Sequence, residues 1–165
     1  MFDVVSSIEG ANALTKIMDA VSNEVKYKGG RAALRKAADL VAGAVKANAQ
    51  RLDDPKTAEQ ISENVAVRWS PKKFKRSGDL MFRVGLLGGA QSKSGQGEFA
   101  GKGKSNPGGD TWYWRLLEFG TRNMQAHPFM RPALEKNTQA ATAEFVRQAK
   151  RSIESAAKKA AKGNK

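Results

Sequence analysis

The sequence predicts an α+β fold made of two N-terminal helices, a small antiparallel β-sheet with a long glycine-rich loop, and a long C-terminal helix. Two observations predict this order. Apolar residues recur every three or four positions before about residue 52 and again after residue 134, which is typical of helices. Between residues 65 and 87 the apolar residues alternate instead with a period of two, which is typical of strands. With 165 residues, the chain is long enough to bury one core without disulfides.

The first helix is expected to begin at Ser6 and Glu9, whose spacing is that of a capping box. Its apolar positions are Ala11, Leu14, Met18, Val21 and Val25. We expect a break at residues 28–30, Lys-Gly-Gly, followed by a second helix that stops at residues 53–55, Asp-Asp-Pro. The face of the second helix that is expected to be buried consists of Leu34, Ala38, Val41, Val45, Asn48 and Leu52, and we call it the second stripe. It is rich in small residues, which let another backbone approach closely, so a partner surface is expected to complete it.

Two strands of an antiparallel hairpin are expected next. The alternating apolar positions are Val65, Val67 and Trp69, and then Leu80, Phe82, Val84 and Leu86. The connection at residues 71–78 is expected to project from the sheet, and it carries four basic residues around Phe74: Lys72, Lys73, Lys75 and Arg76. This cluster is a candidate contact for phosphates or an acidic partner, although lysines that merely keep a turn soluble would look the same.

Residues 88–110 contain eight glycines in 23 residues and are expected to form a long flexible arm. Within this segment Gly103-Lys104-Ser105 resembles the end of a phosphate-binding loop. That motif requires its first glycine at position 98, which is Glu98, and no apolar strand leads into it. A nucleotide site is therefore not expected.

The span from Trp112 to Leu134 is the most informative part of the chain. It holds two of the three tryptophans, the only histidine and two prolines, and its large aromatic side chains predict that it is packed against the core. Gly120 predicts that a helix or strand stops there with a positive φ, and Pro128 and Pro132 predict the start of the next helix. Glu118 lies inside this cluster, and a buried carboxylate needs a partner. The candidate partners are Arg115, Arg122, Arg131 and the backbone of the Gly120 turn.

The C-terminal helix is expected to continue to about Ala160 and then to fray. Its apolar face is Leu134, Ala141, Phe145, Ala149, Ile153 and Ala156, and lysines trail at the favourable negative end of its dipole. We therefore predict one domain over residues 1–160, with the arm at 88–110 inside it and a basic disordered tail at 161–165.

Catalytic, metal and cofactor sites are not expected. The chain has no cysteine, which excludes thiol chemistry, and no Gly-x-Ser-x-Gly motif surrounds a serine. His127 is the only histidine and has no acidic residue within four positions. The protein is therefore expected not to be an enzyme. No apolar run is long enough to cross a bilayer and no signal peptide is recognised, so a membrane partner is not expected either.

The positive charge is distributed unevenly. Residues 1–65 hold nine basic and nine acidic residues, so the whole net charge of +13 lies after Val65. This asymmetry indicates an anionic neighbour, either DNA or an acidic protein surface, or else a basic face that is simply solvated.

Two motifs resemble the signature of a known family. Glu118-Phe119-Gly120-Thr121 ends an aromatic run, and a second motif follows it: Pro128, Phe129, Met130, Arg131, Pro132, Ala133 and Leu134. Together they resemble the small tail-component, or tail-completion, proteins of long-tailed bacteriophages of the Hong Kong type. The chain departs from that family mainly in its unusually long glycine-rich loop.

The resemblance implies a structural virion protein. It implies a minor tail protein that forms a homo-oligomeric ring of six copies at the head-tail junction, or neck, and docks the tail to the head. The implied partners are the tail terminator, the tail tube and the neck or head-completion proteins, with genomic DNA a candidate in the lumen. Assembly would occur in the host bacterial cytoplasm, and the mature protein would reside in the virion.

The residues expected to serve assembly or the family motif are Trp112, Trp114, Glu118, Phe119, Gly120, Thr121, Pro128, Phe129, Met130, Arg131 and Pro132. The alternative function is a basic nucleic-acid-binding module, in which the residue 72–76 cluster would contact phosphates and tryptophans would stack on bases. An enzyme is the weakest of the three hypotheses.

Overall fold

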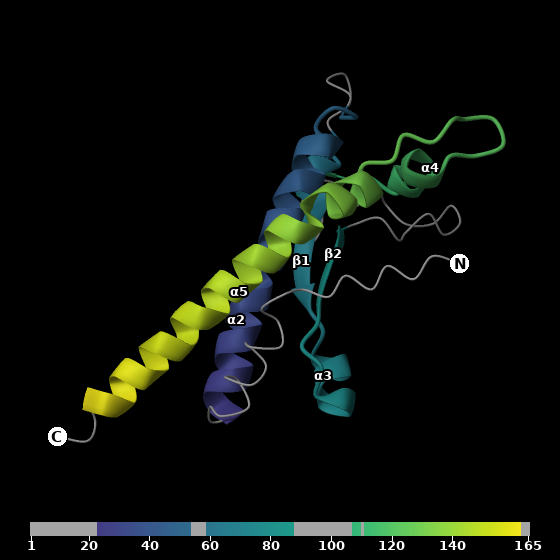
Figure 1. Ribbon diagram of the computed structural model, residues 1–165. Coiled ribbons are helices and arrows are strands. Elements are labelled where there is room, and N and C mark those ends of the chain that lie inside the picture. The colour runs from purple at the N-terminus through teal and green to yellow at the C-terminus, as the bar shows by residue number, and fades with distance from the viewer. Residues whose placement is uncertain (1–22, 54–58, 88–106, 110, 163–165) are drawn as a thin grey trace, which may run out of the picture.

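The structure is a computed structural model that describes residues 23–53, 59–87, 107–109 and 111–162. In this part of the chain it is an α+β fold in which two long helices pack beside a two-stranded sheet (Figure 1). The elements are α2 (Asn23–Ala49), η1 (Ser62–Asn64), β1 (Val65–Trp69), α3 (Pro71–Ser77), β2 (Phe82–Leu86), α4 (Trp114–Phe119) and α5 (Met130–Lys162).

Helix α2 runs without interruption through Gly29 and Gly30, so the expected break at residues 28–30 is wrong. The physical reason is the packing of α5 on this part of α2. Gly29 is buried, and a Cβ atom placed on it would lie 2.1 Å from the Ser152 Oγ atom of α5. The loss of helix propensity is thus offset by the close approach of a second helix. The first expected helix lies mainly in residues 1–22, outside the described residues.

The end of α2 comes earlier than expected, at Ala49. A turn follows in which the N–H groups of Leu52 and Asp53 donate to the Ala49 carbonyl. Asp53 then accepts hydrogen bonds from the Ile61 N–H and the Ser62 hydroxyl, both at 2.6 Å. This carboxylate joins the end of α2 to η1, which leads directly into the sheet.

The antiparallel hairpin is confirmed. Val65 pairs with Leu86, Val67 with Val84, and Trp69 with Phe82. The connection between the strands is the short helix α3, which begins with Pro71 at its first turn and ends at Gly78 in the left-handed conformation. Proline is favoured in a first turn because the N–H that it lacks has no intrahelical acceptor there.

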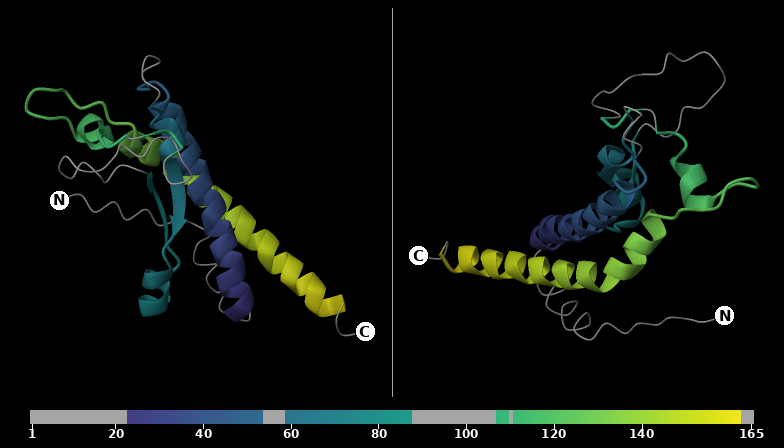
Figure 2. Two further views of the ribbon diagram at one scale, coloured as in Figure 1. Left: turned by 180° about the vertical axis from the view of Figure 1, so that it is seen from behind. Right: turned by 90° about the horizontal axis from the view of Figure 1, so that it is seen from above.

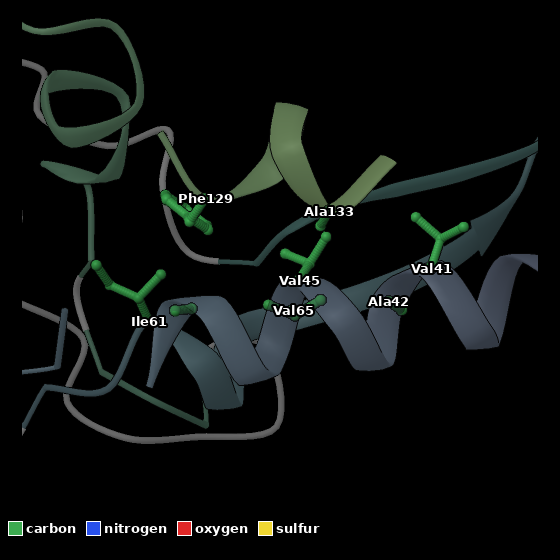
Figure 3. Close-up of a cluster of buried hydrophobic side chains, with 8 residues drawn as sticks. Val41, Ala42, Val45, Ile61, Val65, Phe129 and Ala133 are labelled. Carbon is green, nitrogen blue, oxygen red and sulfur yellow. The ribbon is translucent and has the colours of Figure 1, made fainter. Parts of the chain in front are cut away.

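The main core is built by α2, the sheet and the start of α5 (Figure 3). Val41 and Val45 of α2 face Phe129 and Ala133, with Ile61 and Val65 completing the cluster. Farther along the two helices, Ala33 of α2 meets Ala149 of α5. The predicted stripe of α2 is correct at Val41 and Val45 but wrong at Leu34 and Ala38, because the neighbouring residues Ala33 and Ala37 are buried in their place. Helix α5 of the same chain supplies the surface that packs on this face of α2. Figure 1 and the left view of Figure 2 show α5 crossing α2.

The long C-terminal helix is confirmed as α5, a helix of 33 residues. Its predicted apolar face is correct at Phe145, Ala149 and Ile153 but wrong at Leu134, which is 56% exposed while Ala133 is buried instead. Most of the glycine-rich segment at 88–110 lies outside the described residues. Its described end, Gly108 and Gly109, is bound by the buried side chain of Asn64.

The close contact at Gly29 predicts opposite effects for two identical substitutions in α2. Gly29→Ala is expected to reduce the free energy of unfolding by about 1–2 kcal/mol, because the new methyl group meets Ser152. Gly43→Ala is the matched control. A Cβ atom there meets nothing within 4 Å, so the higher helix propensity of alanine should raise the free energy of unfolding by about 0.5–1 kcal/mol. Urea denaturation measures both, and stabilisation by both substitutions would contradict the packing.

Candidate functional site

The buried carboxylate of Glu118, in α4, lies at the start of α5. Its Oε2 atom accepts hydrogen bonds from the N–H groups of Phe129 (2.7 Å) and Met130 (3.0 Å), and its Oε1 atom accepts one from the N–H of Arg131 (3.1 Å). The first N–H groups of a helix have no partner inside that helix. A side chain from one helix therefore caps the next, and the two family motifs are joined by direct hydrogen bonds.

Arg131 completes this arrangement from the other side. Its Nε atom donates to Oε1 of Glu118 at 3.2 Å, and its Nη2 atom donates to the Glu118 backbone carbonyl at 2.8 Å. The expectation that Glu118 needs a partner is confirmed, and that partner is Arg131 together with the backbone of residues 129–131. Arg115 instead lies over the ring of Trp114, at 5.5 Å from its centroid.

The environment of Glu118 favours its ionised form. Burial raises the pKa of this carboxyl group, but the backbone N–H groups of residues 129–131 and the Arg131 guanidinium outweigh burial and hold the pKa below its ordinary value. The side chain is only 2% exposed. Glu118 therefore remains charged at neutral pH, and its negative charge also complements the positive end of the α5 dipole.

Gly120 ends α4 with φ 73° and ψ 179°, so the predicted positive φ is confirmed. Its N–H donates to the Leu116 carbonyl, and beyond it Thr121 pairs with Met124 in a short bridge. The chain then returns to α4, where the N–H of His127 donates to the Leu117 carbonyl at 2.7 Å. The turn between α4 and α5 stands out from the rest of the molecule (Figures 1 and 2).

The expected burial of the whole aromatic segment is wrong for several residues. Phe129 lies in the core with 1% of its surface exposed, and Trp114 is half-buried against that core, but Phe119 is 65% exposed. The reason is helical periodicity, because Trp114, Leu117 and Glu118 share the inner face of α4, whereas Leu116 and Phe119 lie on its outer face. Five exposed large apolar residues lie in or next to α4, in the turn that follows it or in the first turns of α5, and we call this set the apolar patch: Trp112, Leu116, Phe119, Met124 and Leu134.

The remaining motif residues lie around the Glu118 cap. Met130 is half-buried beside the core and Pro132 is half-buried in the first turn of α5, whereas Thr121 and Pro128 are exposed. The guanidinium of Arg131 also lies 5.2 Å from the centroid of the Phe119 ring. The structure thus brings most of this predicted set together around one helix start.

The predicted basic cluster is located elsewhere, at the opposite end of the hairpin from α4 (Figure 1). Lys72, Lys73, Lys75 and Arg76 lie on α3, and the Lys73 ammonium is 3.5 Å from the Asp79 carboxylate. Phe74 of the same helix packs against Tyr27 of α2 and Trp69 of β1, with ring centroids 5.3 and 5.6 Å apart. The projecting connection is therefore a helix whose single aromatic residue contacts α2.

Sequence reasoning missed the aromatic and basic residues that surround Phe74. Tyr27 and Arg31 come from α2, while Trp69 and Phe82 come from the paired strands. Roughly forty positions separate the α2 residues from the strand residues, so no local spacing relates them. Only the tertiary contact of the hairpin with α2 reveals that they line one groove.

The described ranges contain no group of three or more histidine, cysteine, aspartate or glutamate side chains that could hold a metal ion. Among these same residues, no helix has the length and apolar character that spanning a membrane requires.

Residues 12–120 match a protein-family model described as "Bacteriophage HK97-gp10, putative tail-component". The matched region includes α2, the hairpin and α4, and it ends at Gly120 of the first motif. No curated protein and no solved structure shows a significant match to the chain.

Proposed function

Since this chain belongs to the HK97-gp10 family of bacteriophage tail components, we propose that it is a structural tail-completion subunit at the head-tail junction of a long-tailed phage. The observation that carries the proposal is the family match, which extends over residues 12–120 of the 165. In this proposal copies of the chain form a ring of six in the virion, which docks onto the tail terminator or tube on one side and onto neck proteins on the other. Its role is geometric and requires no catalytic group.

The apolar patch supports a role in subunit contacts. Large apolar side chains gathered on one surface of a soluble protein often mark an interaction site. These residues come from the turn before α4, from α4 itself, from the protruding turn and from the start of α5. The Glu118 cap holds the last turn of α4 against the start of α5. Rings are built by heterologous contacts, in which one surface of a subunit meets a different surface of the next. We assign the patch to one half of such a contact.

A basic nucleic-acid-binding module is the second candidate, and the net charge of +13 favours it. The three tryptophans give it less support. Trp114 is half-buried against the core, and Trp69 has the Arg31 guanidinium over its ring, which leaves Trp112 as the exposed indole. Tight binding of DNA by a monomer, weakening steeply as salt is raised, would favour this second function over the first.

Phe119 provides the test of the patch. Phe119→Ser is expected to weaken self-association about 10- to 100-fold, because it removes roughly 1.5–3 kcal/mol of apolar burial from the contact. Light scattering of the purified protein, alone and with the neighbouring tail proteins, gives the mass of the assembly. Since the side chain is largely exposed in the subunit, the urea midpoint should change little.

Gln139→Ser is the matched control, because Gln139 is exposed on α5 outside the apolar patch. It is expected to leave the mass of the assembly unchanged. A wild-type protein that stays monomeric with and without its neighbours would overturn the ring. An assembly unaffected by Phe119→Ser would show instead that the patch is not the contact.

A further inference from the structure

A groove of about 630 Å³ lies between the N-terminal half of α2, helix α3 and the hairpin. Its lining includes Phe74 of α3, and α3 lies at the opposite end of the hairpin from α4 (Figure 1). The assembly role proposed above does not use this groove. We call it the α2-hairpin groove. Its apolar residues are Tyr27, Ala32, Trp69, Phe74, Leu80 and Phe82.

The aromatic residues of this groove form an irregular apolar floor. The ring of Trp69 is tilted by 51° against Phe74 and by 52° against Phe82, and Tyr27 meets Phe74 edge-on. These rings therefore do not offer a set of parallel faces on which successive nucleobases would stack. Apolar side chains of a peptide need no parallel faces, so they suit this floor better.

The basic residues of the groove come from one side. Lys28, Arg31 and Arg35 lie on successive turns of α2, and none of the described residues that line the groove is acidic. The Arg31 guanidinium lies over the Trp69 ring at 4.9 Å from its centroid. The Nε atom of Arg35 lies 3.8 Å from the Oδ2 atom of Asp39, and both of these side chains are well exposed. Arginine held over an aromatic ring is pre-organised to bind a carboxylate at the edge of an apolar surface.

We propose that the α2-hairpin groove binds an acidic segment of a different tail protein, with apolar side chains on the aromatic floor and carboxylates against α2. Only the source of this segment rests on the function proposed above. A second copy of the chain is disfavoured because its net charge of +13 would bring mostly like charge to the basic rim. The groove thus gives the subunit a second docking surface, distinct in chemistry from the apolar patch.

Peptide binding tests this proposal on the full chain. The probe is a short fluorescein-labelled synthetic peptide of alternating glutamate and leucine, and fluorescence anisotropy reports its binding. Two further peptides replace every glutamate with lysine or every leucine with serine. We expect binding of the glutamate-leucine peptide and at least tenfold weaker binding of both others, because each lacks one half of the match.

Charge reversal at the groove is the complementary test. Arg31→Glu is expected to weaken binding of the glutamate-leucine peptide at least tenfold. Lys36→Glu makes the same charge change on an exposed residue of α2 that does not line the groove, and it should weaken binding less than threefold. Urea denaturation of both variants verifies that the fold is retained. If Arg31→Glu unfolds the chain, the affinities of the wild-type protein for the three peptides provide the test of the proposal.

Three results would overturn the proposal. Equal binding of the glutamate and lysine peptides would show that charge does not select the ligand. Tighter binding of a single-stranded oligonucleotide, lost in Arg31→Glu, would assign the groove to nucleic acid. If the wild-type protein binds no peptide and Arg31→Glu abolishes self-association, the groove would be assigned to a second copy of the chain. If the protein binds the peptide but never associates with tail proteins, the result would support the groove as a peptide-binding site and would contradict the proposed tail function.

Discussion

Replacing Glu118 with alanine is expected to lower the free energy of unfolding by about 2–3 kcal/mol and the melting temperature by roughly 5–10 °C. The substitution removes the acceptor of three backbone N–H groups at the start of α5 and the ionic partner of Arg131. A fully buried ion pair would cost more to break, but Arg131 is 57% exposed and water can solvate it. Urea and thermal denaturation followed by circular dichroism measure the effect.

Two further variants locate the cause of this loss. Glu118→Gln keeps one side-chain oxygen as an acceptor but removes the charge, so an intermediate loss is expected. Glu135→Ala removes an exposed carboxylate in the first turns of α5, and it should change the free energy of unfolding by less than about 0.5 kcal/mol. A melting temperature for Glu118→Ala equal to that of the wild type would refute the structural role of this carboxylate.

Because the pKa of Glu118 is lowered, the difference in stability between the wild type and Glu118→Gln should depend on pH. The folded protein holds the pKa of this group below its ordinary value of 4.5, so the unfolded chain binds the proton more tightly. The stabilisation is therefore complete above the unfolded pKa and is lost as the pH falls through the folded pKa. We expect the stability difference between wild type and Glu118→Gln to be largest near neutral pH and to shrink below about pH 4.5. A difference that is the same at acidic and neutral pH would argue against ionisation as its source.

Gly120→Ala is the second substitution with a large expected effect, a loss of about 2–3 kcal/mol. The combination of φ 73° and ψ 179° is one that essentially only glycine adopts. A Cβ atom at this position would also lie 2.9 Å from the Ala126 nitrogen and 3.0 Å from the Met124 oxygen, both of them backbone atoms. Because backbone atoms cannot rotate away, the turn itself would have to move.

Gly85→Ala serves as the control for Gly120→Ala. Gly85 lies in β2 without a positive φ, and a Cβ atom there meets nothing within 4 Å. Its replacement is expected to change the urea midpoint little. Equal midpoints for Gly120→Ala and Gly85→Ala would contradict the conformation described for the turn.

The fold was predictable where local pattern and tertiary structure agree. The strands follow from a period of two that continues through Val65, Val67 and Trp69, and their register places these residues opposite apolar partners. The continuity of α2 was not predictable, because Gly29 opposes helix formation locally and is compensated by Ser152 more than a hundred residues away. Leu134 was placed on the wrong face because its neighbour Ala133, although smaller, is the residue that fits against α2.

The site was predictable in part for a similar reason. A carboxylate among aromatic residues indicated that Glu118 needed a partner, and the chain nearby contained Arg131 as a candidate. The spacing of the residues could not predict that this carboxylate also caps α5. Glu118 and its backbone donors at residues 129–131 are separated by a turn, and the sequence does not determine the conformation of that turn. The aromatic floor around Trp69 was beyond sequence reasoning altogether, since it depends on how the hairpin lies against α2.

The hydrogen bonds of Glu118 and His127 have a consequence for how such proteins can diversify. They fix both ends of the turn that joins α4 to α5, one through the carboxylate and one through the Leu117 carbonyl. Lengthening a loop whose ends are fixed costs little, because the closure entropy grows only with the logarithm of its length. Residues such as Arg122 and Asn123 at its exposed tip can therefore be replaced or extended to suit a new neighbour while the helices on either side keep their positions.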